Sequence, residues 1–184
     1  LKNGEMTPAS SISATLQDSL ATDPVAAVRA SAATALGSDR QPLARAALER
    51  AASTDVSARV RVAALISLVK DEPDAALASF AERAFDEAFS WGTAAAAARV
   101  YVAASEDKVE WIESALERSS PHDVLRASLF GLLGEQEDPR AAGILRAWSL
   151  DEEVNAKARA AAVIALVLVS RNDPDTVALL AGFL

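Results

Sequence analysis

The chain repeats itself every 32 to 33 residues, and no other feature restricts its fold so strongly. In the first copy, Val28, Ala32 and Leu36 follow one another at four-residue spacing, which places them on one face of a helix. The same three positions recur at Val60, Ala64 and Leu68, at Thr93, Ala97 and Tyr101, at Leu125, Leu129 and Leu133, and at Ala158, Ala162 and Leu166. Equivalent positions are numbered below by the first copy, so that frame position 28 denotes Val28, Val60, Thr93, Leu125 and Ala158.

A second series with the same period lies between these segments, at Leu16, Leu48, Phe80, Ile112, Leu145 and Val177. Its members belong to amphipathic segments in which apolar residues recur at three- and four-residue spacing. Two interleaved series with one period predict two helices per repeat, which we call the first and the second helix. We therefore predict an all-α fold of about 11 helices in about 5.5 repeats, stacked as a solenoid.

The composition agrees with one continuous helical array. Apolar residues make up 51% of the chain but aromatic residues only 5%, so alanine, the best helix former, supplies much of the apolar content. We predict a single repeat domain over residues 10–184, preceded by a disordered or tag-like segment over residues 1–9. The chain starts at Leu1 and has its methionine at Met6, so we expect it to be a fragment of a larger protein.

Residues with well-defined preferences at helix ends mark the boundaries. Asp23-Pro24 and Ser120-Pro121 place a capping side chain before proline, which predicts that second helices begin there. Asp123, three residues after Ser120, predicts a capping box with aspartate in place of the usual glutamate. Gly37 and Gly134 predict the ends of second helices.

The segment DPVAAVRASAATALG (23–37) resembles the HEAT-like repeat, whose second helix typically reads Asp-Pro-x-x-x-Val-Arg-x-x-Ala-x-x-x-Leu-Gly. Later copies match in part, and the third departs most, with Thr93-Ala94 in place of Val-Arg. The resemblance covers residues 10–184. It implies a right-handed α-α superhelix that serves as an interaction scaffold, and it says little about activity because function depends on sites that vary within a fold.

A second resemblance concerns SWGTAAAAA (90–98), the segment 111–148 and NAKARAAAVIALV (155–167). These segments look like the HEAT-like C-terminal region that follows the catalytic part of some bacterial zinc aminopeptidases. This implies a non-catalytic accessory domain beside a peptidase. The zinc motif HExxH is absent from this sequence, so no catalytic residue carries over.

Charge and residue inventory argue against several function classes. A net charge of −8 and a pI near 4.7 do not suit nucleic-acid binding, which requires a basic surface. The sequence has no stretch of 18 apolar residues, so we do not expect it to insert into a membrane. The absence of cysteine excludes disulfides but does not determine the compartment, for which the cytoplasm is our default. We interpret His122, the single histidine, as an exposed residue at a helix start, and the paired carboxylates as surface groups. We therefore predict no catalytic residue, metal or cofactor; a HEAT-like enzyme is the remaining alternative.

Arginine occupies frame position 29 in four of the five copies, at Arg29, Arg61, Arg126 and Arg159. The HEAT-like resemblance implies that such an arginine bonds acidic groups or carbonyls of neighbouring repeats, and we interpret this ladder as structural, holding the repeats in register. The alternative is a row of donors for an acidic ligand or partner.

The face of the second helices opposite the core is poor in charge, whereas the first helices carry most of the outward charges. Second helices line the concave side of such solenoids, so we predict an apolar concave contact surface that includes Val62, Ile66, Trp91, Arg99, Val102, Val124 and Ile164. Its occupant would be a protein segment or a companion domain of the same chain. Tighter curvature, which would bury part of this surface, is the alternative.

Overall fold

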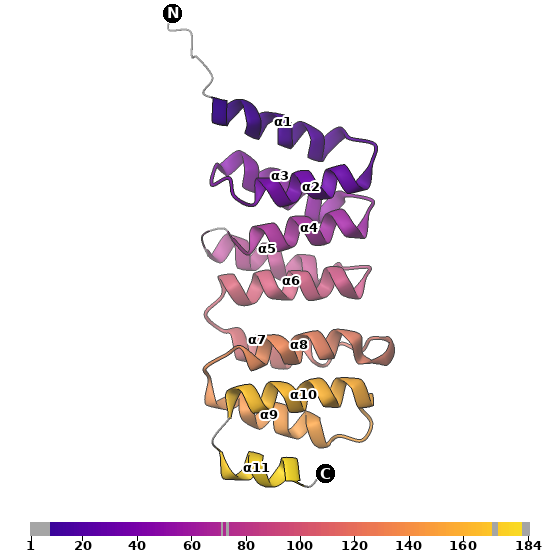
Figure 1. Ribbon diagram of the computed structural model, residues 1–184, viewed down its shortest axis with the longest axis vertical. Helices are drawn as coiled ribbons and strands as arrows, with labels where there is room; N and C mark the ends of the chain where they lie inside the picture. The colour runs from indigo at the N-terminus through magenta and orange to yellow at the C-terminus, as the bar shows by residue number, and fades with distance from the viewer. Residues whose placement is uncertain (1–7, 71, 73, 171–172, 182–184) are drawn as a thin grey trace, which may run out of the picture. The chain divides into compact units, whose positions relative to one another are not determined.

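The computed structural model describes residues 8–70, 72, 74–170 and 173–181 of the chain. In this part every regular element is helical, which confirms the predicted all-α class and the eleven helices (Figure 1). The α-helices are α1 Pro8–Thr22, α2 Ala26–Leu36, α3 Pro42–Thr54, α4 Ala58–Leu68, α5 Ala75–Asp86, α6 Trp91–Ala104, α7 Lys108–Ala115, α8 Val124–Gly134, α9 Pro139–Leu150, α10 Ala156–Val169 and α11 Pro174–Ala181. A short 3₁₀ turn, η1 Pro121–Asp123, precedes α8.

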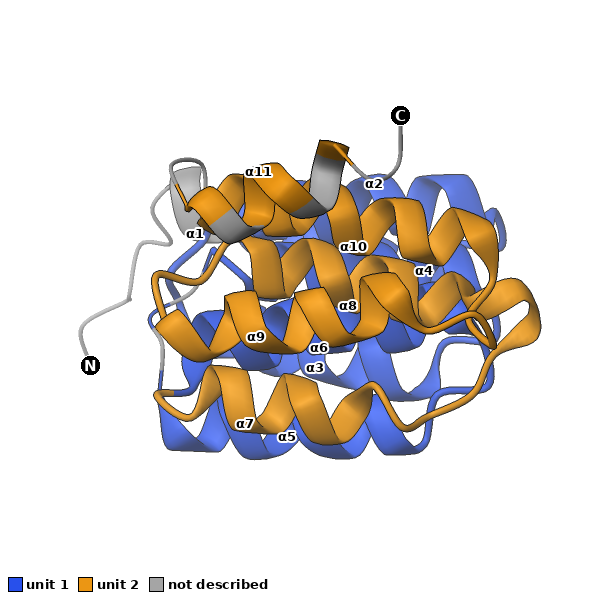
Figure 2. Ribbon diagram, turned by 90° about the horizontal axis from the view of Figure 1, so that it is seen from below, with its two compact units in different colours: residues 1–105 blue, residues 106–184 orange. Residues whose placement is uncertain are grey.

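The chain divides into two compact units, residues 1–105 and residues 106–184, which are coloured separately in Figure 2. Residues 1–7, most of the predicted N-terminal segment, lie outside the described part, and α1 already begins at Pro8. Each unit is described by itself below.

Unit 1 contains three helical hairpins, α1–α2, α3–α4 and α5–α6. Each second helix packs against the first helix of its own hairpin. In addition, α2 packs on α4 and α4 on α6, while α1 packs on α3 and α3 on α5. This is the packing of a repeat-like helical array, and its core is formed by residues such as Leu36, Leu65, Leu68 and Leu77, all of which are fully buried.

Unit 2 contains the first helices α7, α9 and α11 and the second helices α8 and α10. Here α8 packs on α7, α9 and α10, and α10 also packs on α9. The fully buried large side chains of α8 form much of its core, namely Leu125, Leu129, Phe130, Leu132 and Leu133.

Frame position 28 shows how a neighbouring helix determines burial. Val60, Leu125 and Ala158 are buried, as the repeat predicts, but Val28 is 41% exposed. In the described part of unit 1, α4 has a second helix on each side, whereas α2 has one second-helix neighbour, α4. Val28 therefore keeps the core position in sequence without the full set of neighbours that would cover it.

The predicted starts of the second helices are wrong by two or three residues. Helix α2 begins at Ala26, after Pro24, and the Asp23 carboxylate accepts a hydrogen bond from the Val25 amide at 2.8 Å, as in an Asx turn. At the other site, the Ser120 hydroxyl accepts a hydrogen bond from the Leu125 amide at 3.0 Å, across the 3₁₀ turn. Both side chains thus order the loop before the helix, and the capping box with Asp123 does not form.

Gly37 and Gly134 lie at helix ends as predicted, but not because a left-handed residue is needed there. Neither has a positive φ. A Cβ atom on Gly37 would lie 2.8 Å from Cβ of Ser67 in α4, and one on Gly134 would lie 2.8 Å from Cβ of Ala165 in α10. Glycine is therefore required in these two copies, because the following second helix approaches Gly37 and Gly134 so closely.

Candidate interaction surface

Frame position 34 of the second helices is exposed in all five copies. Its members are Thr34 in α2, Ile66 in α4, Arg99 in α6, Gly131 in α8 and Ile164 in α10. Ile66 and Ile164 are 49% and 64% exposed. The side chains of Ile66, Arg99 and Ile164, which were expected on this surface, are therefore exposed.

Frame positions 27 and 38 are also exposed in all five copies. Position 27 lies about two helical turns before position 34, and position 38 lies about one turn after it. Position 27 holds Ala27, Arg59, Gly92, Val124 and Lys157, and position 38 holds Ser38, Lys70, Ala103, Glu135 and Leu168. Together with position 34 they form what we call the outward stripe of each unit. Leu168 was missed by the sequence reasoning, although it lies four residues after Ile164 and the helical repeat could have identified it.

Three residues expected on this surface are not fully outward. Val62 and Trp91 are half-buried at the edge of the stripe. Val102 is only 7% exposed, so the outward position expected for it is wrong. It occupies the same frame position as Gly37 and Gly134, both of which are buried against the following second helix of their unit. In those two copies the position faces the neighbouring second helix and not the outward side.

The outward stripes of the two units differ in chemistry. In unit 1 the charged members are Arg59, Lys70 and Arg99, and Ile66 is the large apolar one. In unit 2 the large members are Val124, Ile164 and Leu168, all about half-exposed, with Glu135 and Lys157 as the charged ones. Exposed aliphatic side chains grouped on two packed helices are a feature of contact surfaces. The concavity expected of this surface stays a prediction.

Two residues with a left-handed backbone conformation precede the first member of the unit 2 stripe, Val124. His122 and Asp123 both have φ of 54°, a left-handed conformation that costs a residue with a side chain about 1–2 kcal/mol. The Asp123 carboxylate stabilises it, because Oδ1 accepts a hydrogen bond from Arg126 Nη1 at 2.7 Å and Oδ2 accepts one from the Asn155 amide at 2.8 Å. An open pocket of about 630 Å³ lies beside this turn, and the residues that line it include His122, Val124, Lys157 and Ala158.

The arginine ladder is largely engaged within the fold. Arg29 makes a two-pronged ion pair with Asp55, with Nε and Nη2 each 2.8 Å from a carboxylate oxygen, and Nη1 donates to the carbonyl of Asp23 at 2.9 Å. The hydrogen bond from Arg29 holds the pKa of Asp55 below its usual value, against the opposing effect of partial burial. This pair connects the first repeat to the loop of the second.

The other ladder arginines bond mainly to backbone carbonyls. Arg61 Nη1 donates to the carbonyl of Asp55 at 2.7 Å, and Arg159 Nη1 donates to that of Asp151 at 3.4 Å. Arg126 Nε donates to the carbonyl of Leu116 at 2.8 Å, and its guanidinium lies 4.8 Å from the ring centroid of Trp148. These contacts fit the structural interpretation of the ladder, with Arg61 and Arg159 making one of them each.

A search for other chemistry in the described residues finds little. They contain no group of three or more histidine, cysteine or acidic side chains that could hold a metal ion. Within the same residues, no helix is both long enough and apolar enough to cross a bilayer. His122 is exposed, as expected from its place before α8.

No protein-family model matches the chain, and a search of curated proteins finds no similar sequence. The helix-pair packing is therefore a property of this structure, whereas the HEAT-like assignment and the aminopeptidase resemblance rest on the residues of the repeat alone.

Proposed function

We propose that this chain is a non-catalytic binding scaffold of the HEAT-like type, whose unit 2 stripe docks an apolar segment of another protein or of a companion domain. The observation that carries the proposal is the exposure of Val124, Ile164 and Leu168 on the neighbouring helices α8 and α10. Fully burying an exposed side chain of this kind is worth about 1.5–3 kcal/mol, and about half of that is available here because each of the three is already half-buried.

The surroundings of these residues suit a contact surface. Gly131 occupies the frame position of Ile164 on the adjacent helix, and a Cβ atom placed there would meet nothing within 4 Å. The centre of the stripe therefore offers space next to aliphatic surface. Lys157 lies on the same stripe beside Val124, and Glu135 lies beside Leu168, so the surface combines apolar and charged side chains, as protein interfaces do.

The same open position supplies the test. Gly131→Arg would place a long cation on the stripe at a position where the added Cβ atom meets nothing within 4 Å, and it improves helix propensity relative to glycine. Thr34→Arg makes the matched change at the equivalent exposed position of α2 in unit 1. Both variants should give the circular dichroism spectrum and thermal midpoint of a folded protein.

A photo-crosslinking amino acid at position 164 would identify the partner in cells that express the protein, with the same amino acid at position 34 as the control. Binding of the purified partner would then be measured by calorimetry. We expect Gly131→Arg to weaken binding by about tenfold or more, equivalent to roughly 1.4 kcal/mol, and Thr34→Arg to leave it unchanged. Equal crosslinking from the two positions, or undiminished binding by Gly131→Arg, would contradict the proposal.

A further inference from the structure

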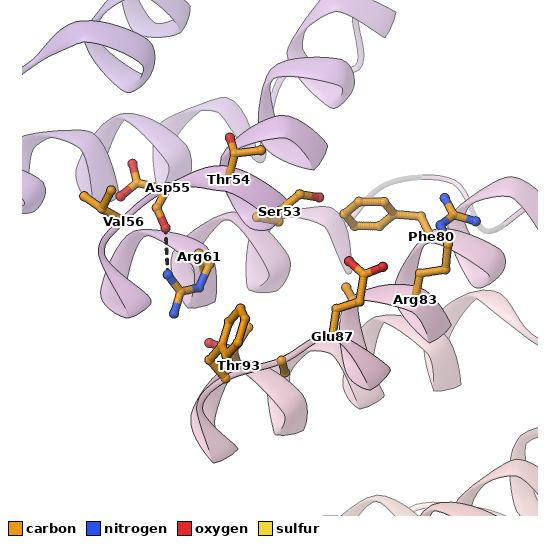
Figure 3. Close-up of a pocket in the computed structure, with 13 residues that line it drawn as sticks. Ser53, Thr54, Asp55, Val56, Arg61, Phe80, Arg83, Glu87 and Thr93 are labelled. Carbon is orange, nitrogen blue, oxygen red and sulfur yellow. Dashed lines mark hydrogen bonds between the residues drawn. The ribbon is translucent and has the colours of Figure 1, made fainter.

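Unit 1 contains two equivalent pockets at successive inter-helix loops, and each is lined by a ladder arginine. The first, of about 480 Å³, is lined by Arg29 together with Asp55 and Val56 of the next loop. The second, of about 370 Å³, is lined by Arg61 together with Ala88 and Phe89 of the following loop (Figure 3). The repeat thus places the same cationic side chain at both sites.

The two sites differ in what the neighbouring loop supplies to the arginine. Asp55 provides both carboxylate oxygens to Arg29 in the first pocket. Its frame equivalent one repeat later is Ala88, because Val60 and Thr93 are 33 residues apart. Within the described part of the chain, Arg61 accordingly donates to the Asp55 carbonyl and forms no ion pair with a carboxylate.

The pocket around Arg61 also exposes apolar side chains. Phe89 is fully exposed and Val56 is 91% exposed, although both line the pocket. Phe80 lines it from α5. In Figure 3 the Glu87 carboxylate lies beside Phe80 and Arg83, with Arg61 on the opposite side of the pocket. The Asp55 carboxylate also lines this pocket, but both of its oxygens accept hydrogen bonds from Arg29. The site therefore combines an arginine that forms no ion pair within the described residues with exposed apolar side chains.

We propose that this pocket binds an acidic side chain followed by an apolar residue in a segment of a partner protein. The chain itself supplies the template: in the first pocket, Asp55 pairs with Arg29 and is followed by Val56. The partner's carboxylate takes the place that Ala88 leaves empty and accepts paired hydrogen bonds from the Arg61 guanidinium, a geometry that arginine favours. Its apolar neighbour packs against Phe89. This site lies on the loops of unit 1 and is independent of the unit 2 stripe.

The test uses a peptide that copies residues 53–57, acetyl-Ser-Thr-Asp-Val-Ser-amide, added to the whole chain labelled with ¹⁵N. We expect the Arg61 Nε–H resonance and the Thr93 amide to shift in proportion to binding. The same peptide with Asn in place of Asp should bind about tenfold more weakly, because a neutral amide cannot form the charge-assisted pair. Equal shifts with both peptides would overturn the proposal.

Variants of the protein separate the site from a general attraction of acidic peptides. Ala88→Asp supplies an internal carboxylate where Asp55 stands in the first pocket, and we expect it to abolish peptide binding. Ala103→Asp, at an exposed position of α6 outside the pocket, adds the same charge and should leave binding unchanged. Glu87→Gln removes a competing acid from the rim and should strengthen binding. Undiminished binding by Ala88→Asp in a folded protein would refute the site.

Discussion

The two units connect successive repeats with the same pair of residue types but arrange them differently. In unit 1, Arg29 reaches forward and its carboxylate partner, Asp55, belongs to the loop of the next repeat. In unit 2, Arg126 pairs with Asp123, three residues before it, and the other oxygen of Asp123 accepts the amide of Asn155 in the next loop. The link between neighbouring loops is therefore preserved although its components have changed places. The connection between neighbouring loops therefore recurs with the repeat, but different side chains can make it.

The interiors differ in a related way. Helix α6 of unit 1 is buried around most of its circumference through small residues, including Ala94, Ala96, Ala97 and Ala98. Helix α8 of unit 2 fills its core with leucines and Phe130. Small side chains allow neighbouring backbones to approach, whereas large ones fill wider spaces, and both give closely packed interiors. Substitutions in the two units should show how independent these two ways of packing are.

The largest effect is expected from Phe130→Ala in α8. Removing a fully buried aromatic ring leaves a cavity and should lower the free energy of unfolding by about 3–5 kcal/mol. Amide hydrogen exchange should accelerate mainly in α8 and α10, because an array of repeats transmits loss of packing chiefly to its nearest neighbours. Equal acceleration in α2 and α4 would show that the two units unfold as one.

A smaller effect is expected from Asp55→Asn, which weakens the connection particular to unit 1. The pKa of Asp55 is lowered in the folded state, so its carboxylate contributes stability above the unfolded pKa of about 3.9, and this contribution is lost as the pH falls through the folded pKa. At pH 7 we expect the thermal midpoint to fall by several degrees. The difference from the wild type should shrink progressively on acidification below pH 4. Asp18→Asn, at an exposed position of α1, is the control and should produce no such pH-dependent difference.

Two glycines three residues apart in α8 should respond in opposite directions to alanine. Gly134→Ala places a Cβ atom 2.8 Å from that of Ala165, and we expect a loss of about 1–2 kcal/mol from overpacking despite better helix propensity. Gly131→Ala meets no neighbour and should raise the free energy of unfolding by about 0.5–1 kcal/mol. Denaturant titration of both variants measures the contrast, and a destabilising Gly131→Ala would show that this position is less open than described.

The smallest effect is expected at the left-handed turn before α8, which has no counterpart in the described residues of unit 1. His122→Gly removes the side chain from a left-handed residue and should stabilise the protein by up to about 1 kcal/mol, the strain relieved being partly offset by the freedom of glycine in the unfolded chain. The frame-equivalent change, Val25→Gly, lies at a residue with φ of −93° and should not stabilise. Chemical denaturation of the two variants gives the comparison.

The repeat predicted the helices, their number and the exposure of frame position 34 because these follow from periodicity alone. It placed Val102 wrongly because a helical wheel does not show which neighbouring helix lies beside a given face; the shared frame position with Gly37 and Gly134 contained that information. The left-handed turn at His122 and Asp123 could not be predicted, since the bonds that stabilise it come from Arg126 and from the next repeat. The pocket at Arg61 has alanine, Ala88, where the preceding repeat has Asp55. This difference has a meaning only once the structure shows that Asp55 pairs with Arg29.

The continuous exposure of frame position 34 has a consequence for how such a chain can evolve. Thr34, Ile66, Arg99, Gly131 and Ile164 already include a hydroxyl, two aliphatic groups, a cation and a bare backbone in one structural setting. Mutations at these positions leave the close contacts between helices untouched, so selection can act on recognition with little penalty in folding. The residues that maintain the fold and the residues that would determine binding specificity can therefore change independently. A library randomised at these five positions would sample new binding preferences on an unchanged framework.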